Sequence, residues 1–239
     1  ESLDKLPISG EVNGEWQTFP DAAALDEALN TEPAPEPAGN FHITDDDLGI
    51  GGPKQKYARN IEAIRTLFQL EQEHRGATAE EQQVLSQYVG WGGLADAFNP
   101  GKDSWAKEYA ELKGLLSEDE YAAARSSTLN AHYTSPVVIR SIYDAVEKMG
   151  FQSGNILEPS MGAGNFFGML PTSMADSRLY GVELDSITGR IAKKLYPQAD
   201  ITVAGFETTD RRDFYDLAVG NVPFGNYKVN DKAYNKLGF

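Results

Sequence analysis

The chain has 239 residues, and its apolar content of 41% is enough for a sizeable core, but it shows neither a run that could span a membrane nor a signal peptide. It contains no cysteine, which excludes disulfides, thiolate zinc sites and a thiol nucleophile, and its three scattered histidines predict no metal site. We expect a cytoplasmic protein without a membrane partner. We also expect a piece of something longer, because the sequence starts at Glu1 rather than Met and stops at Phe239 without a closing helix or strand.

The formal net charge of −15 argues at first against a nucleic-acid partner, because surfaces that bind nucleic acids are basic. The excess acid lies in the first half. Residues 1–129 hold 10 Lys and Arg against 24 Asp and Glu, whereas residues 130–239 hold 11 against 12. The second half also carries local basic groups at Arg190, Lys193, Lys194, Arg211 and Arg212. Any DNA-binding surface is therefore expected to be local, or to come from other parts of the protein.

The first 130 residues predict two regions. Residues 1–50 resemble an acidic and largely irregular leader, since prolines interrupt 30–40 and a charge run follows; a short helix is predicted over 20–30. Residues 51–130 predict a small helical region with an amphipathic helix over 57–74. Thr78 and Glu81 predict a capping box at the start of a second helix over 78–89, and two more helices are predicted over 104–116 and 117–125.

The remainder of the chain alternates between helix and strand patterns. A helix is predicted over 137–150, followed in order by a strand and turn at 154–160, a helix starting at 165, a strand at 178–185, a helix at 186–197, and strands at 199–206 and 214–221. Strands that alternate with helices at this spacing predict a parallel, doubly wound sheet.

Two glycines follow the first of these strands in "ILEPSMGAGNFFG" (156–168). Gly162 and Gly164 lie between a strand and a helix, where glycine lets the backbone pass close to a ligand. A dinucleotide site would have a third glycine three residues after Gly164, but Phe167 stands there, which weakens a nicotinamide interpretation.

Two acids end neighbouring strands. Glu183 follows Gly162 by 21 residues, at a position where an acid accepts hydrogen bonds from ribose hydroxyls; a solvated carboxylate is the alternative. Glu158 ends the first strand and is placed to pair with a positive group of a ligand. Adenosylmethionine carries an ammonium and a sulfonium, whereas a dinucleotide carries phosphates that a carboxylate repels, so Glu158 favours adenosylmethionine.

Four motifs in this region resemble those of the N6-adenine DNA methyltransferases: "YTSP" (133–136), "LEPSMGAGNF" (157–166), "GVELD" (181–185) and "GNVPFG" (220–225). They stand in that family's most familiar order. More loosely, the chain resembles the methylase-like region of large helicase–methylase proteins of conjugative elements. The resemblance implies a partial class I, Rossmann-like α/β methyltransferase sheet over 131–239, incomplete at its C-terminus and preceded by the small helical domain.

The resemblance also implies S-adenosyl-L-methionine as the cofactor and a set of residues that bind it. Tyr133, Thr134 and Pro136 would line the methionine end, and Phe206 would approach the adenine of the cofactor, with a place in the core as the alternative for Phe206. The complete expected set is Tyr133, Thr134, Pro136, Glu158, Pro159, Ser160, Gly162, Gly164, Glu183 and Phe206.

The expected catalytic tetrapeptide is Asn221, Val222, Pro223 and Phe224. By the resemblance, the side-chain oxygen of Asn221 and the carbonyl of Val222 each accept a hydrogen from the target amine, whose lone pair then attacks the methyl sulfonium directly. Phe224 would stack on a flipped base, and Pro223 would stiffen the turn. The family has proline where this chain has Val222, which keeps the carbonyl but leaves the turn less rigid.

We therefore predict methyl transfer to the N6 amine of adenine in DNA, with DNA bound largely by parts of the protein beyond this chain and with a helicase domain as a possible neighbour in the parent protein. Cytosine C5 methylation would need a cysteine nucleophile, which is absent. Two alternatives stay open: methylation of a protein glutamine or an RNA amine, and a catalytically degenerate module that only binds DNA.

Overall fold

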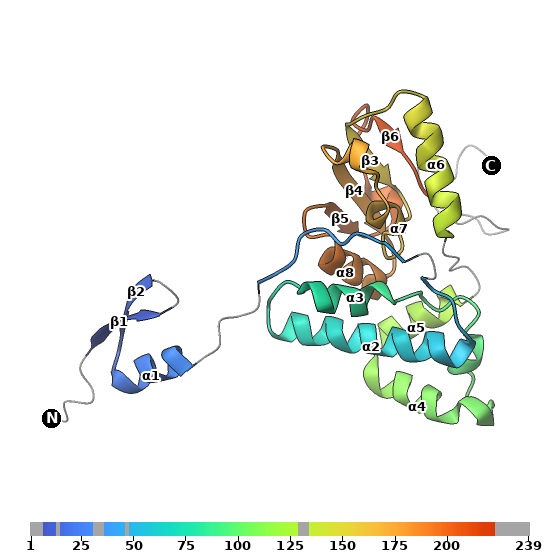
Figure 1. Ribbon diagram of the computed structural model, residues 1–239. Helices are drawn as coiled ribbons and strands as arrows, with labels where there is room; N and C mark the ends of the chain where they lie inside the picture. The colour runs from blue at the N-terminus through green and yellow to red at the C-terminus, as the bar shows by residue number, and fades with distance from the viewer. Residues whose placement is uncertain (1–6, 13–14, 31–35, 46–47, 129–133, 223–239) are drawn as a thin grey trace. The chain divides into compact units, whose positions relative to one another are not determined.

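The computed structural model describes residues 7–12, 15–30, 36–45, 48–128 and 134–222 (Figure 1). The chain divides into two compact units, Glu1–Glu36 and Pro37–Phe239. Among the described helices, none is long and apolar enough to cross a membrane.

The first unit is a two-stranded sheet with a helix. Strands β1 (Ile8–Val12) and β2 (Glu15–Phe19) pair antiparallel, and α1 (Ala22–Asn30) begins after Asp21, whose carboxylate accepts a hydrogen bond of 2.9 Å from the amide of Ala24. Gly10 makes room for the helix, since a Cβ there would lie 2.7 Å from Cδ1 of Leu25. The helix predicted over 20–30 is therefore confirmed by α1, whereas the prediction of an irregular leader is wrong for β1 and β2, because the short strands gain their packing from α1.

The second unit begins with helices. They are α2 (Pro53–Gln72), α3 (Ala79–Ser86), α4 (Ala106–Leu115) and α5 (Glu118–Ser127). The predicted capping box of Thr78 and Glu81 is present at the start of α3, and Ser117 and Glu120 form another at the start of α5. These four helices lie within the segment for which the sequence predicts helices.

The rest of the second unit is an α/β sheet. Its elements are α6 (Pro136–Lys148), β3 (Asn155–Glu158), α7 (Asn165–Gly168), β4 (Arg178–Glu183), α8 (Ser186–Leu195), β5 (Asp200–Val203) and β6 (Leu217–Ala218). All strand pairs are parallel, in the order β5-β4-β3-β6. The first strand of the unit thus lies between the second and the fourth, as in a Rossmann fold, which confirms the predicted fold class.

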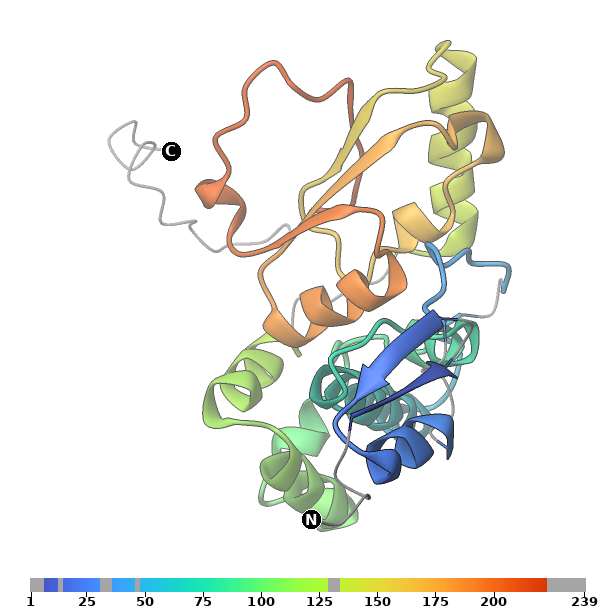
Figure 2. The same cartoon turned by 90° about the vertical axis from the view of Figure 1, so that its left-hand side faces the viewer.

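Two elements of the sheet region are short, and one of them, β6, is shorter than the strand predicted over 214–221. Helix α7 is a single turn, and Gly168 at its end lies so close to Ile43 and Tyr196 that a Cβ would be 2.6 Å from each. Strand β6 has two residues, and the crossover that leads to it from β5 contains a 3-10 turn at Phe206–Thr208 but no α-helix (Figure 2).

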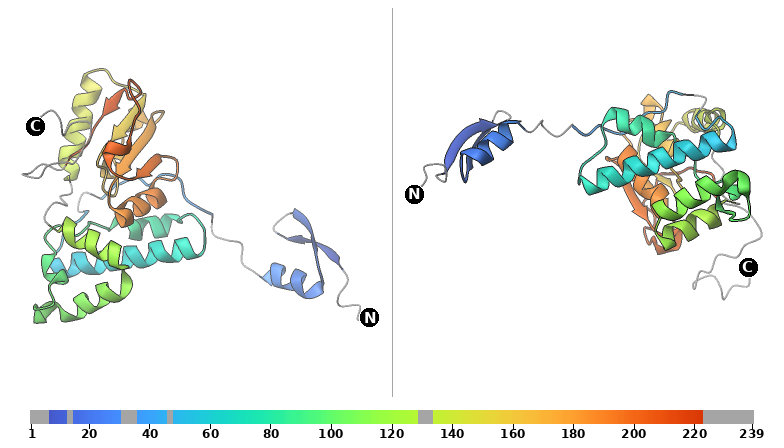
Figure 3. Two further views of the ribbon diagram at one scale, coloured as in Figure 1. Left: turned by 180° about the vertical axis from the view of Figure 1, so that it is seen from behind. Right: turned by 90° about the horizontal axis from the view of Figure 1, so that it is seen from below.

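Helix α8 joins the helices to the sheet. It lies between the sheet and the pair α2 and α3 in the views of Figures 1 and 3, and it contacts β4 and β5 as well as both helices. The side-chain nitrogen of Gln82 on α3 donates to the carbonyls of Gly39, Lys194 and Leu195. Residues from Ile43 to Val219 form one hydrophobic core, so the predicted boundary near residue 130 falls within one compact unit.

Candidate functional site

The predicted site residues collect where the four parallel strands end. Glu158 ends β3 and Glu183 ends β4, while Phe206 follows β5 and Asn221 follows β6. The amide of Val219 donates to the carbonyl of Leu157 at 2.9 Å, which holds the chain after β6 beside the end of β3. Ligands of parallel α/β sheets bind at this edge.

The glycine turn after β3 is hydrogen-bonded to Glu183, the acid that ends β4. Gly162 and Gly164 have φ of 57° and 86°, a left-handed conformation that glycine adopts without strain. The amide of Gly162 donates to Oε2 of Glu183 at 2.7 Å, and the amide of Asp185 donates to Oε1 at 2.8 Å. Burial raises the pKa of Glu183 above its usual value, although these two hydrogen bonds act in the opposite direction. Each carboxylate oxygen keeps a second lone pair, so Glu183 can still accept hydrogen bonds from a ribose.

Glu158 has the least satisfied side chain of this edge. It is only 3% exposed, and its Oε2 has no hydrogen-bond partner among the described residues. Burial, and then the charge of Glu183, raises the pKa of Glu158 well above its usual value. Gly220 lies against it, because a Cβ on Gly220 would be 3.5 Å from Cγ of Glu158. The residue next to Asn221 therefore leaves no more than the room of a methyl group beside the acid of β3.

These features fit adenosylmethionine. A buried carboxylate oxygen without a partner is suited to a cationic group, and a half-buried acid beside a glycine turn is suited to a ribose. In the described residues, no group of His, Asp and Glu is arranged to hold a metal ion.

The other predicted residues lie as follows. Thr134 and Pro136 are half-buried at the start of α6, whose N-terminal end faces the edge where β3 ends (Figure 1). Pro159 and Ser160 are half-buried in the turn after Glu158. Phe206 is 50% exposed, so its alternative place in the core is wrong. Asn221 and Val222 are exposed, whereas Tyr133, Pro223 and Phe224 lie outside the described residues.

Two buried tyrosines support the site, and the sequence analysis missed both. The ring of Tyr196, just after α8, packs so closely on the turn that a Cβ on Gly164 would lie 2.4 Å from its Cε2. The hydroxyl of Tyr143 on α6 donates to the carbonyl of Phe166 at 2.9 Å. Burial raises the pKa of each hydroxyl, and the charge of Glu158 raises it further. The only sequence signal for them is an aromatic residue at an apolar helix position.

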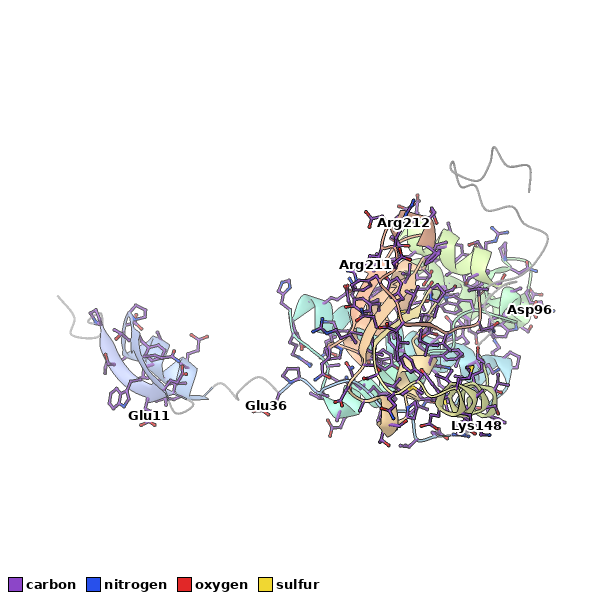
Figure 4. The ribbon with its side chains drawn as sticks, turned by 90° about the horizontal axis from the view of Figure 1, so that it is seen from above. Glu11, Glu36, Asp96, Lys148, Arg211 and Arg212 are labelled. Carbon is purple, nitrogen blue, oxygen red and sulfur yellow. The ribbon has the colours of Figure 1, made fainter. Side chains whose placement is uncertain are left out.

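Three of the basic groups considered for a DNA surface have partners inside the unit. The guanidinium of Arg190 binds Glu71 on α2 and Glu120 on α5, with a distance of 2.6 Å to each. The ammonium of Lys194 donates to the carbonyl of Arg75. Arg211 pairs with Asp200 at 2.9 Å, and it lies beside Arg212 in the crossover before β6 (Figure 4). Arg190 and Lys194 thus connect elements of the fold. The sequence did not reveal these contacts, because the partners lie far away along the chain.

Comparison with known proteins gives two curated relatives. No family model matches the chain. It is 28% identical over 163 residues to Defense against restriction protein B of Escherichia phage P1, a match that covers 66% of this chain and 6% of that protein. It is 34% identical over 93 residues to the type II methyltransferase M.CvrRI of Paramecium bursaria Chlorella virus XZ-6E, a match that covers 38% of this chain and 24% of that protein.

A solved structure from Listeria monocytogenes, described as a class I S-adenosylmethionine-dependent methyltransferase, matches with a TM-score of 0.34 and 14% identity over 73% of this chain and 61% of that chain. The chain thus spans a small part of the curated relatives that it matches. Its homologues include a phage protein of defence against restriction and a viral type II methyltransferase, and the methyltransferase resemblance expected from the motifs is confirmed.

Proposed function

We propose that the second unit is the cofactor-binding part of an S-adenosyl-L-methionine-dependent DNA methyltransferase that acts on the N6 amine of adenine. One observation carries this proposal: the ends of four parallel strands bring a glycine turn, the buried Glu158, the half-buried Glu183 and Asn221 to one edge. The viral type II methyltransferase among the relatives supports the reaction class, and the "GNVPFG" motif supports an amine as the acceptor.

Each residue of the edge has a distinct role in the proposed reaction. Glu183 accepts hydrogen bonds from the ribose hydroxyls, and Glu158 pairs with a cationic group of the cofactor. Bound adenosylmethionine supplies a methyl group on a sulfonium, which is a strong electrophile. Asn221 and the carbonyl of Val222 accept the two hydrogens of the target amine and orient its lone pair, so that alignment supplies much of the rate.

DNA is proposed as the substrate, with contacts made largely by other parts of the protein. The phage relative, named for defence against restriction, is consistent with a role on DNA. Within the described residues, Arg190 and Lys194 are occupied by partners of the fold.

Calorimetric titration with adenosylmethionine tests the cofactor site. We expect saturable binding, weakened at least about tenfold by Glu183→Ala, because charge-assisted hydrogen bonds contribute about 1.5–3 kcal/mol. Asp176→Ala is the matched control, since it removes an exposed carboxylate just before β4, at the opposite edge of the sheet, and it should bind like the wild type. Equal affinity in the Glu183 and Asp176 variants would contradict the assignment.

Transfer of a labelled methyl group tests the substrate. We expect label in adenine of DNA, but not in RNA or protein, with a chain that extends past Phe239. Asn221→Ala should abolish transfer while leaving the affinity for the cofactor unchanged. Label in a protein glutamine or an RNA amine would favour the second substrate class. DNA binding that is indifferent to adenosylmethionine would favour a degenerate module, for which Val222 in place of proline is the supporting feature.

A further inference from the structure

The carboxyl group of Glu158 is buried in a place that does not suit its charge. The side chain is 3% exposed, and Oε2 lacks a hydrogen-bond partner among the described residues. An ionised carboxylate in such a place loses the stabilisation of water and gains nothing in return. Its burial therefore needs a reason that the fold of the sheet alone does not provide.

The neighbours of Glu158 make ionisation still less favourable. From β4, Glu183 faces it as a second carboxylate, and its charge acts against that of Glu158. From α6 and from the end of α8, the hydroxyls of Tyr143 and Tyr196 are neutral, and their own pKa values are raised by Glu158. After β6, the nearby Gly220 has no side chain and therefore brings no charge to Glu158. Within the described residues, no cationic side chain acts on Glu158.

We propose that Glu158 determines the specificity of the site by exchange: it holds a proton in the empty site and releases that proton to solvent when a cationic group of the ligand takes its place. The net charge of the buried pocket stays constant, because one positive charge leaves as another arrives. A ligand without a cation near Glu158 gains nothing from the exchange. The inference rests on the proposed function, since adenosylmethionine supplies the cation.

The exchange has two measurable consequences. Binding releases about one proton for each cofactor bound in the pH range where Glu158 is protonated in the empty site. In that range the affinity rises with pH by up to about tenfold for each pH unit, because deprotonation of Glu158 is part of the binding reaction.

The experiment is calorimetric titration of the whole chain between about pH 5.5 and 7, where an α-ammonium of normal pKa stays charged. Buffers of different ionisation enthalpy give the number of protons released. Three ligands separate the cations: adenosylmethionine carries an ammonium and a sulfonium, S-adenosylhomocysteine carries the ammonium alone, and methylthioadenosine carries neither. We expect proton release with adenosylmethionine and none with methylthioadenosine. Proton release with S-adenosylhomocysteine would show that the ammonium is the exchanged cation, and its absence would show that the sulfonium is.

Glu158→Gln keeps the shape of the side chain and removes its titration. We expect this variant to release no proton on binding adenosylmethionine and to lose the rise of affinity with pH, while Asp176→Asn behaves like the wild type. If Glu158→Gln does not fold, as judged by circular dichroism, the three-ligand comparison on the wild type still decides.

The outcomes separate this inference from the proposed function. Binding of adenosylmethionine without proton release, or with equal release in Glu158→Gln, overturns the exchange and leaves the cofactor site intact. Proton release that is equal for methylthioadenosine also overturns it, because that ligand has no cation. Absence of any adenosylmethionine binding by the folded chain overturns the proposed cofactor site, and the exchange with it.

Discussion

Two features make position 164 specific for glycine: a left-handed backbone conformation and the close approach of a buried aromatic ring. The φ of Gly164 is 86°, and an added Cβ would lie 2.4 Å from Cε2 of the buried Tyr196. Gly164→Ala should therefore lower the free energy of unfolding by about 2–4 kcal/mol, through both backbone strain and overpacking. Urea unfolding followed by circular dichroism measures this change.

Gly93 offers a matched control for this prediction. Its φ is 74°, but an added Cβ would meet nothing within 4 Å. Gly93→Ala should cost only the strain of the left-handed backbone, about 1–2 kcal/mol. Equal losses in the two variants would show that the contact with Tyr196 contributes nothing.

At the scale of residues, sequence position was enough to find the residues of the site, but not their hydrogen bonds and packing contacts. Gly162, Gly164 and Glu183 were predictable because each follows a recognisable strand in a parallel sheet, where strand ends share one edge. The missing partner of Glu158 and the ring of Tyr196 were not predictable. They depend on which side chains the fold brings together across tens of residues.

At the scale of elements, Arg190 fastens α8 to two helices. A lysine has one point charge and cannot replace the two arms that reach Glu71 and Glu120. We expect Arg190→Met to lower the free energy of unfolding by about 3 kcal/mol, because two partly buried carboxylates lose their partner, and Arg190→Lys to lose less. The exposed Lys193 on the same helix is the control, and Lys193→Met should change stability by less than about 0.5 kcal/mol.

Glu81 on α3 forms an ion pair with Arg75, and this pair makes the free energy of unfolding depend on pH. Hydrogen bonds from Arg75, helped by the amide of Thr78, lower the pKa of Glu81 to about 2 from its usual 4.5. Because the folded-state pKa is the lower one, the contribution of Glu81 is complete above about pH 4.5 and is lost as the pH falls toward 2. Glu81→Gln keeps a side chain that can close the capping box but removes the charge.

We therefore expect Glu81→Gln to be less stable than the wild type by about 1 kcal/mol at pH 7 and equal to it near pH 2. Urea midpoints at several pH values measure the difference between the two proteins. A difference that stays constant with pH would show that the ion pair with Arg75 is not its source.

Elements with strong local signals were predictable, and those fixed by tertiary contacts were not. The capping box of Thr78 and Glu81 located the start of α3 because both partners lie within four residues. The hairpin of β1 and β2 was missed, since its packing depends on Gly10 lying beneath Leu25 of α1. The start of helix α7 at residue 165 was predicted, whereas its length of a single turn was not.

At the scale of the whole molecule, the second unit should unfold as one body, because its helices and its sheet share one core. Tryptophan fluorescence can test this. Trp91 and Trp105 lie in the helical region and are 1% and 6% exposed, whereas Trp16 of the first unit is 75% exposed. In a Trp16→Phe background, fluorescence therefore reports the helical region, while circular dichroism reports all helices and strands.

Ile156 lies fully buried in β3, a central strand of the sheet. Ile156→Ala should lower the free energy of unfolding by about 2–5 kcal/mol. Because the core is shared, the urea midpoint seen by tryptophan fluorescence should fall together with that seen by circular dichroism, although neither tryptophan is in the sheet. Met149→Ala, at an exposed position after α6, should move neither midpoint. A fluorescence midpoint that stays fixed in Ile156→Ala would mean that the helices fold independently of the sheet, and the boundary predicted near residue 130 would then be a true domain boundary.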